Sequence, residues 1–486
     1  MQVRLSSYVL TVALAAFIST PSSAAKIGSL DTSWGTNGVA TVQFPGSGSS
    51  VVQSVSVGTD NRVVVGGYLE RKIPAIAGIT FSEYDGVIQA LSATGAPDAS
   101  FGTNGTVQLD DGNFNYQVVY LKVKADGKIF GIANRRKLDG MAAFMTPDQN
   151  QFDVVFFQLN KDGSFDSNYG TNGLVLYHRN NNADTVGKVT PSTDGKLLLR
   201  LSEFCTSGNS CPSFYYLSKF DFNGNKDLSY GLNGEIGPQP NAEIFPLSAY
   251  DVFVLKDGSE IFGAQVAMWP NGYFYQRFLA SGELDTSFGS NVNGSITLTS
   301  TKSLIQIGQT FPLTANGLSL LVYGVEADSL TDSYSLFTRK YFSTGEQDSA
   351  FITNLDSTLS TTATPNARPV KEYSDGKILF QSVDYTTATD TQPSQCKLTS
   401  FRTLADATID KAYAPLASTQ VTIPGSAVFC NVLAVEDGAK GKQVELVQQS
   451  NASGPQSYSI IRYSGGALNT VLVGLLGLLG MRRKLK

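Results

Sequence analysis

One motif occurs seven times along this chain, and it limits the possible folds more than any other feature. The first copy begins at Asp31 in LDTSWGTNG, where an aspartate is followed by an aromatic residue and then by glycines. Later copies begin at Asp98, Asp166, Asp227, Asp285, Asp348 and Asp410. A period of about 60 residues is too long for a solenoid of paired helices and matches one four-stranded blade. The repeat therefore predicts an all-β, seven-bladed β-propeller of about 60-residue four-stranded repeats.

Two further landmarks keep the same period. A tight turn lies between successive motifs, as in ADGK at Ala125, TDGK at Thr193 and SDGK at Ser374. Asp-Gly between two apolar runs is a strong hairpin signal. An aromatic-rich stretch such as YFYQRFLASG precedes the next motif. Each period thus holds four strand candidates, and we expect the motif to join successive blades.

The two ends of the repeat region fit a closed ring. No aromatic-rich strand precedes the first motif, whereas a spare one, YSIIRYSGG, follows the last period at Tyr458–Gly466. Pairing of the N- and C-terminal segments would complete a blade and remove free sheet edges. The sequence therefore predicts that the two ends of the folded ring are neighbours.

The motif residue types suit a turn that packs between blades. The aspartate can accept backbone N–H bonds, and the glycines permit positive φ. The aromatic residue of each copy is expected to pack between adjacent blades; these are Trp34, Phe101, Tyr169, Tyr230, Phe288, Phe351 and Tyr413. Five copies keep the full motif, at Asp31, Trp34, Gly35 and Gly38; Asp98, Phe101, Gly102 and Gly105; Asp166, Tyr169, Gly170 and Gly173; Asp227, Tyr230, Gly231 and Gly234; and Asp285, Phe288, Gly289 and Gly294.

The alternative for the motif is a calcium site that uses oxygens of Asp31, Ser33 and Asn37. Each copy supplies one carboxylate, whereas an EF-hand loop needs several. The structural turn is the favoured interpretation, and no phosphate-loop pattern is present.

The repeat resembles the delta-60 repeat, a bacterial β-propeller repeat, on its DGK turn and its (L)DxSFGxxG motif. Five copies match well, and those at Asp348 and Asp410 are degenerate. The resemblance implies a propeller and little about activity, because the repeat defines that family.

Both ends of the chain differ from the repeat region. Residues 1–25 have the pattern of a signal peptide, with Arg4 before an apolar run and a cleavage site after Ala24 or Ala25. A buried strand or a membrane anchor is the alternative there. Residues 26–466 form the expected propeller, and residues 467–486 form a hydrophobic and basic tail.

The tail resembles the GlyGly-CTERM sorting signals of Gram-negative bacteria. Gly465 and Gly466 precede an apolar run, and Arg482 and Arg483 begin its basic end. The resemblance implies signal peptidase and a rhomboid-like protease, rhombosortase, as processing partners. It also implies transient anchoring in the inner membrane, and then a location at the cell surface, in the outer membrane or outside the cell. A permanent single-pass anchor is the alternative.

Charge and cysteine usage narrow the function classes. The chain has a net charge of −5, and removal of both ends would leave about −10, which disfavours nucleic acid as a partner. Cys205 with Cys211, and Cys396 with Cys430, are the favoured disulfides among three possible connectivities. With no CxxC pair and a single histidine, His178, no metal site or cofactor is predicted.

No catalytic motif emerges. Asp boxes of sialidases, tryptophan docking motifs of quinoproteins, WD and kelch signatures and a GxSxG elbow are absent. His178 is expected to be a solvated loop residue. The segments Met141–Gln151 and Ala267–Phe278 could shape a binding rim, the latter through its aromatic rings.

We expect an exported scaffold that binds a protein or glycan. A carbohydrate-active hydrolase or lyase with channel carboxylates, or a structural envelope protein, are the alternatives.

Overall fold

The structure is a computed structural model of the chain. It describes residues 28–46, 48–74, 80–110, 112–137, 152–178, 183–204, 214–237, 249–266, 272–289, 294–298, 304–315, 317–328, 333–362, 364, 366–386, 395–413, 418–424, 429–438, 442–450 and 456–464. The predicted signal peptide at residues 1–25 and the tail at 467–486, with Gly465, Gly466, Arg482 and Arg483, lie outside the described residues. Within the described residues, no helix has the length and apolar character needed to cross a membrane.

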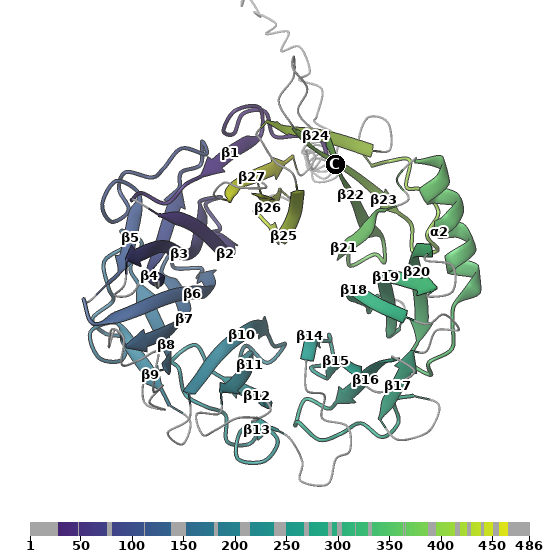
Figure 1. The fold of residues 1–486 in the computed structure, drawn as a ribbon, viewed down its shortest axis with the longest axis horizontal. Helices are drawn as coiled ribbons and strands as arrows, with labels where there is room; N and C mark the ends of the chain where they lie inside the picture. Colours follow the sequence, from purple (N-terminus) through teal and green to yellow (C-terminus); the bar gives the residue numbers. More distant parts are fainter. Residues whose placement is uncertain are drawn as a thin grey trace, which may run out of the picture.

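Seven antiparallel sheets stand side by side in a ring, as Figure 1 shows, and they confirm the predicted seven-bladed β-propeller. Blade 1 contains β2 (Ser49–Val57), β3 (Val63–Pro74), β4 (Thr80–Leu91) and β5 (Thr106–Leu109). Blade 2 contains β6 (Phe114–Val123), β7 (Ile129–Lys137), β8 (Phe152–Leu159) and β9 (Leu174–Tyr177). Blade 3 contains β10 (Ala183–Pro191), β11 (Leu197–Phe204), β12 (Phe214–Phe220) and β13 (Glu235–Ile236). Blades 4 and 5 contain β14 (Ala249–Val254), β15 (Glu260–Val266), β16 (Gly272–Phe278) and β17 (Ser295–Leu298); and β18 (Leu304–Leu313), β19 (Ser319–Asp328) and β20 (Ser333–Phe342). Blades 6 and 7 contain β21 (Arg368–Glu372), β22 (Ile378–Thr386), β23 (Gln395–Thr403) and β24 (Ser418–Pro424); and β25 (Phe429–Asp437), β26 (Gln443–Ser450), β27 (Ser457–Tyr463) and β1 (Val39–Val42).

The ring closes in blade 7, where the two ends of the chain pair. Strand β1 lies antiparallel to β27, with Val39 opposite Ile461 and Val42 opposite Tyr458. The Asp31 N–H donates to the Arg462 carbonyl at 2.9 Å, which extends the pairing into the first motif. The predicted closure is therefore confirmed, because the N-terminal segment supplies the outer strand of the last blade.

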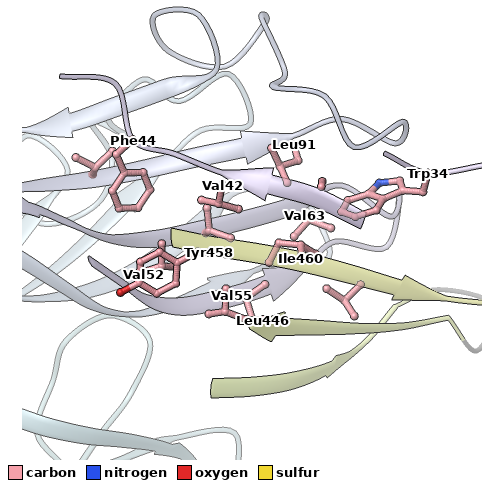
Figure 2. Packing of buried hydrophobic residues seen from close by; sticks show 14 of the residues in the cluster. Trp34, Val42, Phe44, Val52, Val55, Val63, Leu91, Leu446, Tyr458 and Ile460 are labelled. Carbon is pink, nitrogen blue, oxygen red and sulfur yellow. The ribbon is translucent and has the colours of Figure 1, made fainter. Parts of the chain in front are cut away.

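The hydrophobic core lies between blades. The cluster at the closure combines Val63 and Leu91 of blade 1 with Leu446 and Ile460 of blade 7, and Trp34 is fully buried within it (Figure 2). Similar clusters fill the spaces between other neighbouring blades. Because each of these clusters draws on two blades, a blade buries its apolar faces only when both neighbours are present.

The motif connects the third strand of a blade to the outer strand of that same blade. The copy at Asp98 lies between β4 and β5, which pair with each other. The expectation that the motif is the turn between successive blades is therefore wrong in its connectivity. The motif still bonds the next blade, because the Gly102 N–H donates to the Asp162 carbonyl of blade 2 at 2.7 Å.

Blade 5 departs from the four-strand pattern. The degenerate copy at Asp348 is followed by helix α2 (Ser349–Thr361), and the described part of this blade has three strands. Ile352 and Leu355 occupy the positions of the two motif glycines, so the positive-φ reversal of the other copies is disfavoured. The Asp348 side chain instead accepts the Phe351 N–H at 3.1 Å as a helix N-cap. Phe351, Leu355 and Leu359 then bury one helix face against the core.

A bulge interrupts the innermost strand of every blade, a feature that the sequence did not predict. The shifts fall between Val52 and Ser54, Val118 and Tyr120, Val186 and Lys188, Ala249 and Asp251, Ile307 and Gln309, Pro369 and Lys371, and Val432 and Ala434. Bulges increase local twist and bend a strand. Their recurrence shows that the bend belongs to the repeat unit.

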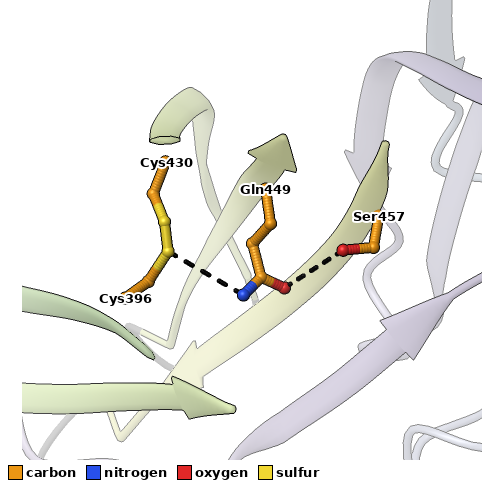
Figure 3. The surroundings of a disulfide bond; sticks show 4 residues. All are labelled: Cys396, Cys430, Gln449 and Ser457. Atoms are coloured by element: carbon orange, nitrogen blue, oxygen red, sulfur yellow. Dashed lines mark hydrogen bonds between the residues drawn. A yellow bond between two sulfur atoms is a disulfide. The ribbon is translucent and has the colours of Figure 1, made fainter. Parts of the chain in front are cut away.

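One predicted disulfide is confirmed. Cys396 of β23 is bonded to Cys430 of β25, so the bond joins blade 6 to blade 7. Gln449 of β26 donates to the Cys396 sulfur and accepts a bond from Ser457, as Figure 3 shows. The other predicted pair, Cys205 and Cys211, lies outside the described residues.

Removal of the Cys396–Cys430 bond should destabilise the ring next to its closure. The bond spans a sequence separation of 34 residues. Its loss should lower the free energy of unfolding by about 4 kcal/mol, because the unfolded chain regains loop entropy. Guanidinium denaturation of the double variant Cys396→Ala, Cys430→Ala measures this loss. Reduced wild-type protein is the control, and an unchanged midpoint in both samples would contradict the prediction.

Candidate functional site

The motif aspartates form a ring of capped and charge-paired carboxylates. One carboxylate oxygen of Asp98 accepts the Ser100 N–H at 3.1 Å and its hydroxyl at 2.6 Å, and equivalent caps occur at Asp31, Asp227 and Asp285. The second oxygen of every motif aspartate contacts a lysine or arginine. These pairs are Asp31 with Lys442 and Arg462, Asp98 with Arg62, Asp166 with Lys128, Asp227 with Lys196, Asp285 with Arg277, Asp348 with Lys340 and Asp410 with Arg402.

The cation comes from one of two positions in the blade. Arg62, Lys128 and Lys196 end the turn between the first and second strands. Where that position holds Ser259 or Leu318, the third strand supplies Arg277 or Lys340 instead. Sequence reasoning missed this pairing, although the lysine of the DGK turn was its visible signal. Blade 6 uses Arg402 although Lys377 ends its turn, and Asp31 is paired with cations from both positions. Every motif aspartate is therefore paired from one or both positions.

This pairing opposes the calcium alternative. Burial would raise the pKa of Asp31, but hydrogen bonds from Lys442 and Ser33 and the charge of Arg462 lower it to about 2. A hydrogen bond from Lys128 lowers the pKa of Asp166 to about 2, and one from Lys196 does the same for Asp227. Both oxygens of the Asp31 carboxylate are already engaged. Among the described residues, no three metal-ligating side chains cluster together.

The other motif residues hold neighbouring blades together. Phe101 is fully buried among residues of blades 1 and 2, and Tyr169 and Tyr230 lie in the next two interfaces. Gly102 has φ of 52°, and a Cβ there would lie 2.2 Å from the Thr106 carbonyl oxygen. The structure therefore places the motif glycines and aromatic residues in packing roles.

The two faces of the ring differ in the regularity of their connections. Successive connections in an antiparallel sheet lie at alternate ends. The first hairpin of each blade and the motif therefore share one face, here named the motif face. The second hairpin and the link to the next blade share the other, here named the loop face.

The first hairpins have the same length in all seven blades, at 58–62, 124–128, 192–196, 255–259, 314–318, 373–377 and 438–442. The second hairpins vary, at 75–79, 138–151, 205–213, 267–271, 329–332, 387–394 and 451–456. Met141–Gln151, the Cys205–Cys211 loop and residues 267–271 all belong to these variable connections, and they lie outside the described residues. The sequence variation of the repeat is therefore concentrated on the loop face.

A polar cluster at the loop-face end of blade 2 includes the single histidine. His178 is exposed and contacts the buried Asp153 carboxylate, which also pairs with Arg135. Arg135 in turn lies 4.0 Å from the centre of the Phe114 ring. His178 is therefore an exposed residue with a carboxylate partner, and the solvated-loop expectation missed that partner. In the aromatic-rich segment Ala267–Phe278, Tyr275 and Phe278 are buried in the core.

Several carboxylates occupy the innermost strands, where the enzyme alternative needs them. Glu436 and Asp437 end β25, and Glu372 ends β21. Burial raises the pKa of Glu436, and the neighbouring charge of Asp437 adds to this, while Lys122 and Lys371 oppose it. Asp437 is paired with Lys371 of blade 6.

Two other acidic groups are enclosed between blades. Burial raises the pKa of Glu260 to about 7, although Tyr230 and Lys219 of blade 3 contact this carboxyl. Glu445 is fully buried and accepts hydrogen bonds from Gln381, Gln443 and Tyr463. Since solvent does not reach either group, both belong to blade packing.

No protein-family model matches the chain, and no curated protein matches it. The fold is similar to the β-propeller domain of the Trilobed protease from Pyrococcus furiosus, with 8% identity, a TM-score of 0.39, and coverage of 86% of this chain and 96% of that one. The WD40 domain of SCAP from fission yeast gives 9% identity, a TM-score of 0.35 and coverage of 87% and 94%. A Trypanosoma rangeli sialidase gives 10% identity, a TM-score of 0.31 and coverage of 92% and 60%. Similarity at this level carries no information about a ligand.

The charge of Asp31 should contribute more to stability than that of Asp98. The Asp31 and Arg462 side chains are 9% and 4% exposed, whereas Asp98 is 21% exposed. Its partner Arg62 is 8% exposed but also donates to the Lys161 carbonyl at 2.7 Å, a bond that remains when Asp98 is replaced. Asp31→Asn should lower the free energy of unfolding by about 3 kcal/mol, because Arg462 stays buried without a carboxylate. Asp98→Asn is the matched control and should cost about 1 kcal/mol or less. Urea denaturation at pH 7 measures both, and equal losses would show that burial of the pair is irrelevant.

The same pairs predict a loss of stability in acid. The pKa of Asp31, Asp166 and Asp227 is about 2 in the folded chain, below the ordinary value of 3.8. Their stabilisation is complete above about pH 4 and is lost as the pH falls through about 2. In a denaturation series over this range, Asp31→Asn should lose less stability than the wild type. Parallel curves for the two proteins would count against this assignment.

Proposed function

We propose that this chain is an exported binding scaffold that recognises a protein or glycan through its loop face. The observation that carries the proposal is the difference between the two faces. The motif face repeats one turn length and pairs each motif carboxylate internally. The loop face carries connections whose lengths differ from blade to blade.

This division suits recognition. A rigid ring holds several chemically different loops in fixed positions, and loops on a fixed scaffold commonly carry binding. The longest second hairpin, residues 138–151, leaves from β7 close to Arg135, His178 and the Phe114 ring. Blade 2 is therefore the first place to test for ligand contact.

Replacement of residues 138–151 by a short Asn-Gly turn should abolish ligand retention and leave the ring folded. The measurement is retention of the purified protein on glycan and protein arrays. Lys411→Gln, an exposed change on the motif face, is the control and should retain wild-type binding. Wild-type protein that retains no probe, or a loop variant that binds as wild type, would argue against recognition by this loop.

The enzyme alternative rests on Glu436, a half-buried carboxyl with a raised pKa on an innermost strand. A polysaccharide panel incubated with the same samples separates the two functions. Product release that Glu436→Gln abolishes would identify a carbohydrate-active enzyme. Retention without product release supports the scaffold.

Export and tail processing are part of the proposal and give a separate prediction. The mature protein should begin after Ala24 or Ala25 and should end near Gly465 and Gly466. Intact-mass measurement of protein recovered from the cell surface and the medium tests both ends. A tail-deleted variant that ends at Gly466 is the control for the mass of processed protein. Surface protein that still carries Arg482 and Arg483 would exclude tail cleavage.

A further inference from the structure

A cavity of about 370 Å³ opens on the motif face where the innermost strands of blades 4, 5 and 6 end. Its walls include Val254 and Lys256 of blade 4, Phe311 and Pro312 of blade 5, and Val370 and Lys371 of blade 6. This volume falls in the usual range for small-molecule sites, about 300–1,000 Å³. The cavity therefore has the size for one ring-sized ligand.

The cavity lies where the repeat is broken. In five other first hairpins an aspartate accepts a backbone N–H two residues later, as Asp257 does from Ser259 at 3.0 Å. The turn at 314–318 has no aspartate. Glu372 of blade 6 supplies the acceptor instead of an aspartate. Its carboxylate accepts the Thr314 N–H at 2.8 Å and the Ala315 N–H at 3.1 Å. The Glu372 carboxylate, which also lines the cavity, is thus engaged in hydrogen bonds with the turn.

The other two charged residues that line the cavity, Lys256 and Lys371, are positive. Lys256 is exposed, and no described residue forms an ion pair or hydrogen bond with its ammonium group. Lys371 is paired with Asp437, whose side chain is 71% exposed. An incoming anion could therefore share Lys371 with a well-solvated partner and receive the charge of Lys256 at little cost.

The rest of the lining is mainly apolar. Val254, Phe311, Pro312 and Val370 supply hydrocarbon surface beside the two ammonium groups. Thr314, Tyr373 and Ser374 complete the lining, and the Thr314 hydroxyl donates to the Glu372 carboxylate at 3.1 Å. An apolar lining that includes two lysines suits an amphiphilic anion better than a neutral or purely polar ligand.

From this arrangement we infer a binding site for a small organic carboxylate with an apolar body, with its carboxylate held by Lys256 and Lys371. The site lies on the motif face and is independent of recognition by the loop face. Benzoate is the test probe, and benzamide is its neutral match in shape.

Titration by saturation-transfer NMR should show that benzoate binds at least tenfold more tightly than benzamide. Lys256→Gln should weaken benzoate at least fivefold, and Lys256→Glu should abolish its binding. Lys411→Gln removes an exposed lysine elsewhere on the motif face and should leave benzoate binding unchanged. Since Lys256 is exposed, all variants should keep the wild-type unfolding temperature, which a thermal scan checks.

Equal binding of benzoate and benzamide, absence of benzoate binding at millimolar concentration, or full affinity in Lys256→Glu would each overturn this site. Retention on the arrays would be unaffected by any of these results. Failure of this inference is therefore distinguishable from failure of the proposed function.

Discussion

The structure depends on ring closure, because a blade buries its apolar faces only against two neighbours. Trp34 is buried only because β1 reaches across the closure and pairs with β27. The Asp31–Arg462 pair and the Cys396–Cys430 bond lie in the same closing blade or at its border with blade 6. The chain thus concentrates covalent, ionic and hydrophobic contacts where the ring would otherwise open. Opening there would expose sheet edges and apolar faces together.

Within each blade, the pair between aspartate and cation links the motif turn to another part of the blade. The aspartate caps the motif turn, while its partner lies on the first hairpin or on the third strand. Lys128 and Arg402 show the two solutions. Because either position can supply the charge, the repeat varies in sequence while the contact persists. A motif that looks like a metal loop in isolation is therefore an internal electrostatic clamp.

The sequence was sufficient for the fold and the closure, since both follow from local periodicity and from counting strands. The Cys396–Cys430 bond was predicted differently, because pairing Cys205 with its near neighbour Cys211 leaves these two cysteines for each other. The sequence was insufficient for α2, where loss of the glycines left Asp348 free to act as a helix cap. It also missed the cation partners, because Arg277 and Lys196 occupy different positions in the repeat and only the folded blade shows their equivalence. The bulges were not predicted because no particular residue type identifies the bulged positions. The cavity beside Lys256 was invisible for a similar reason, as three blades contribute to it.

In a repeat protein, positions shared by all copies serve the common structure, and positions that differ between copies are available for recognition. Positions that recur in every blade, such as the motif aspartates, serve packing that every blade needs. A binding site that occurs once in the ring requires residues that differ from those at the equivalent positions of the other blades. Such differences include the unequal hairpins of the loop face and the turn at 314–318, where Glu372 accepts the backbone N–H groups. In our proposals, the unequal hairpins bind a large ligand, whereas the turn beside Glu372 borders a small cavity that binds an organic anion. Because the two lie on opposite faces, the two proposed sites would not overlap, and ligands of different size would not compete for the ring.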